Sequence, residues 1–211
     1  MPSLIEKLFA RLESRYGSKF VRHALAYITA SKNGLSSAEL EDILSCDDEV
    51  LDEIFSHWFP PFRRIPQLLW IRVRNDIGMY LMERGTDGIT AYNWYHRQFW
   101  ETAGWRYLEC KEESGTNFRA KAHEAIAEYF EGKYTQGKPY KDQNQDRQIP
   151  KQPIVLTGDR NVGRKLNVRK LSEQAYHLLM MQDWSRMEKT VADLEFIEAK
   201  FEANQGYECL R

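Results

Sequence analysis

The sequence lacks the features of a disulfide-stabilised, zinc-binding or membrane-spanning protein. Its three cysteines, Cys46, Cys110 and Cys209, are far apart and form no CxxC pair, which argues against a disulfide framework and a structural zinc site. No apolar run approaches the roughly 20 residues needed to cross a bilayer. The first residues resemble neither a signal peptide nor a transit peptide. We therefore expect a cytoplasmic protein with free thiols and no membrane partner.

An excess of charge of either sign is also missing. The chain contains 30 basic and 31 acidic residues among its 211 positions. This balance provides no broad field that would attract nucleic acid or an anionic membrane. The hydrophobic share of 42%, with 13% aromatic residues, is that of a folded chain that buries one good core or two small ones.

Apolar residues recur at helical spacing near the N-terminus and predict a pair of helices. Residues 4–12 and 20–28 carry this pattern, and we expect them to pack as a hairpin around Gly17. The tetrapeptide Ser36-Ser37-Ala38-Glu39 is a capping box, in which the serine and the glutamate satisfy free amides at a helix start. This motif predicts a third helix over residues 38–44.

A fourth helix should begin at Asp47 or Asp48, which are both suitable N-caps. Its apolar face would include Trp58, and Pro60-Pro61 would stop it. We expect residues 63–70 to lead from there into the wing, the β-hairpin described next.

Two runs of strand character follow, at residues 79–84 and 89–92. They are separated by Gly85-Thr86-Asp87-Gly88, whose glycines suit a tight reversal, so we expect a β-hairpin. An aromatic-rich helix over residues 94–110 follows the hairpin. This order of helices, hairpin and helix predicts a winged-helix domain whose last helix begins near His96.

We therefore predict a mainly α protein: a winged-helix domain with a small β-hairpin wing, followed by an α-helical array or linker domain. The winged helix would occupy residues 1–113, and residues 114–132 would form a connecting helix. Residues 133–166 include a stretch rich in Lys, Gln, Asn and Asp, which predicts a flexible loop or linker. Residues 167–211 regain helical periodicity as three short helices, and we interpret them as the start of a helical domain. No second copy of this unit is present, so periodicity alone does not establish a repeat.

Several separated motifs, in order, resemble the NACHT-and-WD-repeat branch of the STAND NTPases, in the segment just after the nucleotide-binding NACHT core. The motifs are Ala26–Ser31, Asn33–Leu40, Arg64–Pro66, Leu69–Trp70, Trp94–Phe99, Asn167–Glu173 and Tyr176–Leu179. The resemblance implies a winged helix, then the beginning of a helical domain that leads to WD repeats in a full-length protein.

The resemblance also implies a nucleotide-sensing residue. In related NTPases of this class, a histidine that opens the last winged-helix helix contacts the β-phosphate of bound ADP and holds the closed, inactive form. His96 is the matching residue, although this chain has Tyr95-His96-Arg97 where Met-His-Asp is commoner. Arg97 is then a second anion partner or an exposed charge. The alternative is that His96 only hydrogen-bonds within the junction between wing and helix. No cofactor is expected in this chain alone, since ADP or ATP would be contacted only together with an upstream NACHT domain.

One stretch, Gly158–Leu166, has two glycines at the spacing of a phosphate-binding loop. However, Arg164 occupies the position of the essential lysine, and Lys165 occupies the position that must present a hydroxyl to magnesium. We interpret it as a polar turn. Without a P-loop and a Walker B carboxylate, the chain is not expected to be an enzyme.

Other polar and aromatic groups support no site. We assign no metal to the carboxylates that lack the calcium-loop order and are expected at helix starts and solvent faces, namely Asp42, Asp47, Asp48, Asp52 and Glu53. The histidines without a nucleophile partner should be core or surface residues: His23, His57, His123 and His177. Core and domain-interface contacts are favoured over base stacking for Trp94, Trp100, Trp105 and Tyr107. A solvated face is favoured over a phosphate or acidic-partner site for the cluster Arg63, Arg64, Arg72 and Arg74.

The leading hypothesis is a non-enzymatic regulatory and scaffolding region of a NACHT-type signalling ATPase. It would couple the nucleotide state of the adjacent NACHT core to downstream repeats, and its helical surfaces would bind other proteins. The alternative is an independent nucleic-acid-binding winged helix. Against this alternative, the helix over residues 38–44 carries Glu39, Glu41 and Asp42, which would face phosphate with the wrong sign.

Overall fold

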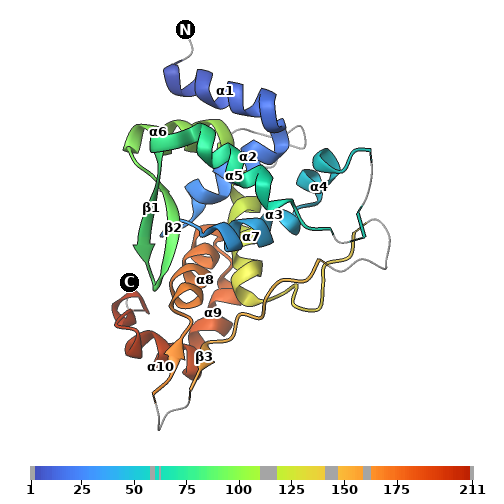
Figure 1. Cartoon of the computed structure of the whole chain (residues 1–211). Coiled ribbons are helices and arrows are strands. Elements are labelled where there is room, and N and C mark those ends of the chain that lie inside the picture. Colours follow the sequence, from blue (N-terminus) through green and yellow to red (C-terminus); the bar gives the residue numbers. More distant parts are fainter. Residues whose placement is uncertain are drawn as a thin grey trace.

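The computed structural model describes residues 3–57, 60–61, 63–109, 118–140, 147–158 and 163–209. Its first two helices, α1 (Leu4–Tyr16) and α2 (Ser18–Ala30), form the expected hairpin around Gly17 (Figure 1). Helix α2 is buried along most of its length, because both of its faces carry apolar residues that other helices cover. It is the centre of the winged-helix core.

The two predicted N-caps are present at the starts of the next two helices. Ser36 and Glu39 form the capping box that opens α3 (Ser37–Ser45). Asp47 caps α4 (Asp48–Ile54) by accepting hydrogen bonds from the amides of Glu49 and Val50. Trp58, expected on the apolar face of this fourth helix, lies outside the described residues.

One helix is absent from the sequence prediction. Residues expected to lead straight into the wing instead form α5 (Gln67–Ile77), which begins directly after Pro66. Trp70, Val73 and Ile77 recur at helical spacing and are buried, so burial of this stripe stabilises the helix. The helix that precedes the wing is therefore α5, and the expectation that residues 63–70 lead directly into the wing is wrong.

The wing is an antiparallel hairpin of β1 (Leu81–Thr86) and β2 (Ile89–Trp94). Only Asp87 and Gly88 form its turn, and both have positive φ, 49° and 80°, as a two-residue turn of type I′ requires. The reversal is therefore tighter than the four residues predicted. The start of the predicted first strand is instead the 3₁₀ turn Gly78–Tyr80.

The last helix of the winged helix, α6 (Arg97–Ala103), continues into the π-helical turn Gly104–Leu108. Its start near His96 is confirmed, since His96 is the N-cap. The expected extension back to Trp94 is wrong, because Trp94 pairs with Leu81 at the base of the wing. Cys110, the expected end, lies outside the described residues.

Helix α7 (Phe118–Glu131) shares the core of the winged helix. Its buried residues Phe118, Ala122 and Ile126 belong to the same hydrophobic cluster as those of α2 and α3. The three predicted C-terminal helices are present as α8 (Val168–Met181), α9 (Trp184–Ala192) and α10 (Leu194–Glu202), followed by the 3₁₀ turn Gly206–Cys209. Helix α8 packs along α7 (Figure 1). The mainly α fold with a small two-stranded wing is thus confirmed, and the domain boundaries stay a prediction.

The segment predicted as a loop or linker carries packing that its composition does not indicate. A short hairpin of β3 (Val155–Thr157) and β4 (Lys165–Leu166) closes its end. Before that hairpin, Tyr140, Arg147 and Ile149 are buried. Arg147 donates to the carbonyls of Lys138 and Pro139 and pairs with Asp48, so a charged residue anchors this segment to the start of α4.

Within the part of the chain that the structure describes, no helix is both long enough and apolar enough to span a membrane.

Candidate functional site

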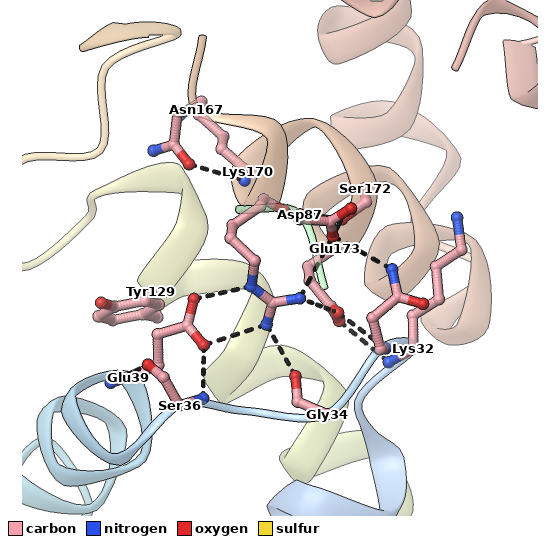
Figure 2. Close-up of polar contacts among 12 residues, drawn as sticks. Lys32, Gly34, Ser36, Glu39, Asp87, Tyr129, Asn167, Lys170, Ser172 and Glu173 are labelled. Carbon is pink, nitrogen blue, oxygen red and sulfur yellow. Dashed lines mark hydrogen bonds and ion pairs between the residues drawn. The ribbon is translucent and has the colours of Figure 1, made fainter. Parts of the chain in front are cut away.

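A buried polar cluster joins α8 to the winged helix, and we call it the α8 junction. It consists of side chains from α8, α3, α7 and the wing turn together with backbone groups and the Asn33 side chain of the α2–α3 loop. Its members are Lys32, Asn33, Gly34, Glu39, Asp87, His123, Arg169, Ser172, Glu173 and His177. Figure 2 shows Glu39, Gly34, Glu173 and Asp87 gathered around one guanidinium group.

The guanidinium at the centre belongs to Arg169, whose side chain is 5% exposed. Its Nε and Nη2 atoms lie 2.9 and 3.1 Å from the two carboxylate oxygens of Glu39, and Nη2 also donates to the Gly34 carbonyl at 2.7 Å. Nη1 donates to Glu173 at 2.8 Å and lies 3.5 Å from Asp87. These contacts engage all five N–H directions of the fork, and they come from four different parts of the chain.

Glu173 receives donors from both sides of the junction. Its carboxylate accepts hydrogen bonds from the amides of Lys32 and Asn33 at 3.0 and 2.9 Å and from His177 Nε2 at 3.1 Å. Burial alone would raise the pKa of Glu173, but the His177 hydrogen bond, the charge of Arg169 and the Lys32 amide together lower it to about 2. Glu173 is therefore ionised at neutral pH and holds the end of α2 against α8.

Two buried histidines extend the junction into α7. The Nδ1 atoms of His123 and His177 lie 2.7 Å apart, so one ring donates to the other. Burial lowers the pKa of His177, and burial together with the neighbouring His177 ring lowers the pKa of His123 to about 3. Both rings are thus neutral at pH 7. Because Glu173 takes the Nε2–H of His177, we infer that His177 Nδ1 accepts and His123 Nδ1 donates. The expectation of core histidines is correct for this pair, but the sequence did not indicate that they meet.

The tip of the wing also docks on α8. Asp87 Oδ2 accepts a hydrogen bond from Ser172 Oγ at 2.7 Å and another from Asn33 Nδ2 at 3.2 Å. Gly34 makes the close approach in this region possible. It has φ of 81°, and a Cβ at this position would lie 2.3 Å from the backbone oxygen of Tyr92 in β2. The wing, the α2–α3 loop and α8 therefore meet at one place.

The predicted sensing residues lie at the other end of β2, away from the α8 junction. His96 is exposed, and its side chain makes no capping hydrogen bond to α6. Its ring contacts Tyr95 edge to face at 4.4 Å. The Arg97 side chain is 87% exposed and pairs with Glu101 one turn along α6. Both residues are thus on an open surface next to the base of the wing.

Asp42, expected at the solvent surface, is buried instead, and Asp47, which caps α4 as expected, has a side chain that is only 11% exposed. Asp42 pairs with Arg64, and its pKa is raised by burial. Asp47 accepts hydrogen bonds from His23 Nδ1 at 2.6 Å and from Tyr27. Burial opposes the ionised form of Asp47, but the charge of His23 and these hydrogen bonds lower its pKa. The expectation failed because α2 and Arg64 supply donors that the local sequence does not reveal.

The predicted acidic face of the third helix is also wrong. Glu39, Glu41 and Asp42 are all buried, so they would not meet a phosphate backbone. The Glu39 carboxylate instead accepts hydrogen bonds from the Ser36 amide in the α3 capping box and from Arg169.

The predicted basic and aromatic clusters are divided among several places. Arg64 and Arg74 pair with Asp42 and Glu83, and Arg63 is buried beside the ring of Tyr140.

Among the aromatics, Trp94 and Tyr107 are in the core as expected. Trp100 and Trp105 are exposed, and the indole N–H of Trp100 donates a hydrogen bond to the Thr29 carbonyl of α2.

The glycine-rich stretch near residue 160 is only partly described, since residues 159–162 lie outside the described residues. Arg164, at the lysine position of a phosphate loop, forms ion pairs with Glu198 and Glu202 of α10. Lys165 is in strand β4. Arg164 therefore links the region of the short hairpin to α10.

The fold and the α8 junction define a winged-helix segment. Its wing tip and its α2–α3 loop are fixed to the helical unit that follows. Residues 1–114 match the family described as "NWD1-like, winged helix-turn-helix domain". The chain therefore belongs to the family of NACHT and WD-repeat proteins, as the winged-helix segment of that family.

Two relatives illustrate the similarity. The human NACHT domain- and WD repeat-containing protein 1 is 41% identical over 184 residues, covering 82% of this chain and 11% of that protein. The mouse NACHT and WD repeat domain-containing protein 2 is 34% identical over 209 residues, covering 82% of this chain and 12% of that protein. The chain thus spans a small part of the curated relatives it matches. No solved structure matches it significantly.

Proposed function

We propose that this chain is a non-enzymatic coupling region, which passes the nucleotide state of an adjacent NACHT core to the repeats that follow. The α8 junction carries this proposal. Arg169 and Glu173 tie α8 to the α2–α3 loop, to α3 and to the wing through buried charge-assisted hydrogen bonds. Such contacts make the winged helix and α8 move together, because separating them would leave charges buried without partners.

The wing connects the proposed sensing residues to the α8 junction. Strand β2 begins after the turn that holds Asp87 on Ser172, and it ends two residues before His96. A displacement at His96 would therefore be carried along one short hairpin to α8. This arrangement meets the requirement for coupling, which is a connected element whose position both sites bias.

His96 and Arg97 are the proposed sensing residues for an ADP phosphate held by the NACHT core. Their exposure suits contact with another domain, and the surface ion pair of Arg97 with Glu101 is weak enough to be exchanged for an anion. Bound ADP would supply a negatively charged group for these donors. In this proposal ATP hydrolysis belongs to the NACHT core, and this chain contacts nucleotide only together with that core in the cytoplasm.

A nucleic-acid-binding role has no supporting surface on α5, the helix before the wing. Its exposed residues include the apolar Leu68 and Ile71 beside Arg72, whereas Arg74 is paired with Glu83. Binding to a phosphate backbone depends on clustered cations. The coupling role is therefore preferred.

Limited proteolysis of a full-length protein that contains this chain tests the coupling. Cleavage beyond residue 211 should differ between the ADP and ATP forms of the wild-type protein. Arg169→Gln should abolish this difference while ADP still binds, and His96→Ala should shift the ADP form towards the ATP pattern. A folded Arg169→Gln variant that retains the full difference between the two forms would refute the proposal.

A further inference from the structure

An apolar groove lies between α1 and the base of the wing. It has a volume of ≈ 660 Å³ and is lined by Leu4, Ile5, Leu8, Tyr80 and Phe99, with Lys7 and Arg11 among its polar residues. The rings of Tyr80 and Phe99 stack at 4.5 Å and give the groove a firm base. Leu4 is 80% exposed at its edge.

The charged residues that line this groove are both basic. Lys7 and Arg11 are exposed on α1, and neither has an acidic partner among the residues that the structure describes. A groove of this kind fits an amphipathic helix that presents an apolar stripe together with carboxylates.

The opposite end of the same chain presents such a helix. On α10, Leu194 and Phe201 are 80% and 58% exposed, and Ile197 lies between them. These positions are spaced by three and four residues, so they form one stripe along the helix. Glu195 is exposed beside the stripe and has no ion pair within the described part of the chain, whereas Glu198 and Glu202 are already paired with Arg164.

We infer that α10 of one copy docks in the α1 groove of a second copy. The apolar stripe of Leu194 and Phe201 would cover the groove, and Glu195 would face Lys7 and Arg11. The two surfaces lie at opposite ends of the molecule, with α1 at the top and α10 at the bottom of Figure 1. A single copy therefore does not bring its own helix into its own groove, and the contact joins two different surfaces of neighbouring copies.

Sedimentation equilibrium of the 211-residue chain at rising concentration tests this contact. The average mass should rise with concentration and fall again in high salt, because exposed charges are screened. Lys7→Glu combined with Arg11→Glu should abolish the rise, and so should Leu194→Ser. Arg72→Glu, which removes an exposed cation of α5 outside the groove, should leave it unchanged.

A charge exchange identifies the pairing directly. The Lys7→Glu, Arg11→Glu variant and a Glu195→Lys variant should each stay monomeric alone and associate when mixed. Circular dichroism of every variant establishes that it is folded. A wild-type chain that remains monomeric at all concentrations would overturn the inference. So would association that persists in the folded groove variant, or a mixture of the two charge variants that stays monomeric.

Discussion

Replacing Arg169 by methionine should strongly destabilise the folded chain. Methionine preserves an apolar stem, but it removes the guanidinium, which lies over the ring of Phe130 and between Glu39 and Glu173. Both carboxylates are then buried with fewer donors, and breaking a buried ion pair in this way costs about 3–5 kcal/mol. Urea unfolding followed by tryptophan fluorescence measures this change in the free energy of unfolding.

Two controls separate the buried charge from other effects. Arg97→Met removes an exposed arginine with one partner on the same helix, and should cost about 0.5 kcal/mol or less. Adding Glu39→Gln to Arg169→Met should restore part of the loss, because one uncompensated charge is removed and glutamine still suits the capping box. The deficit of Arg169→Met should also shrink as the pH falls, since an unpaired buried carboxylate takes up a proton. If Arg169→Met costs no more than Arg97→Met, the account of the α8 junction is wrong.

Three further predictions concern pH, the backbone and nucleotide. The free energy of unfolding should fall as the pH drops below about 6.5. In this range the unfolded chain protonates His123, whereas the folded chain does not, because the pKa of His123 there is about 3. His123→Phe should therefore reduce this first loss of stability. A second loss should begin below pH 4.5, where the unfolded chain protonates Glu173 and the folded chain, with a pKa of about 2, does not; Glu173→Gln should remove it. Gly34→Ala should cost about 2 kcal/mol or more by urea unfolding, because alanine at φ of 81° is strained and its Cβ would meet the Tyr92 carbonyl, whereas Gly85→Ala, with open space around it, should cost less. His96→Ala should cost about 1 kcal/mol or less in the isolated chain, and calorimetric titration of that chain with ATP or ADP should detect no tight binding.

The sequence was sufficient for features encoded within a few residues. The capping box of Ser36 and Glu39 and the cap formed by Asp47 are local hydrogen bonds, so their residue types predict them directly. The hairpin was also predicted, although its turn is formed by Asp87 and Gly88 alone and not by the four residues expected. The family motifs correctly indicated the winged helix.

Features that depend on distant contacts were not predictable. Helix α5 was missed because Arg72, Arg74 and Asp76 interrupt its apolar pattern, although Trp70, Val73 and Ile77 bury against other helices. Glu39 and Arg169 are 130 residues apart, and the sequence offers no sign that they meet. Two of the motifs that carried the family resemblance, Asn33–Leu40 and Asn167–Glu173, contain these two residues, but the motifs by themselves do not indicate the pairing.

Hydrogen exchange of the whole chain tests the central claim that the winged helix and α8 form one unit. The α8 amides should be protected nearly as strongly as those of α2, and Arg169→Met should accelerate exchange in α8 while α2 stays protected. If α8 in the wild-type chain exchanges far faster than α2, it opens independently of the winged helix, and the coupling account is contradicted.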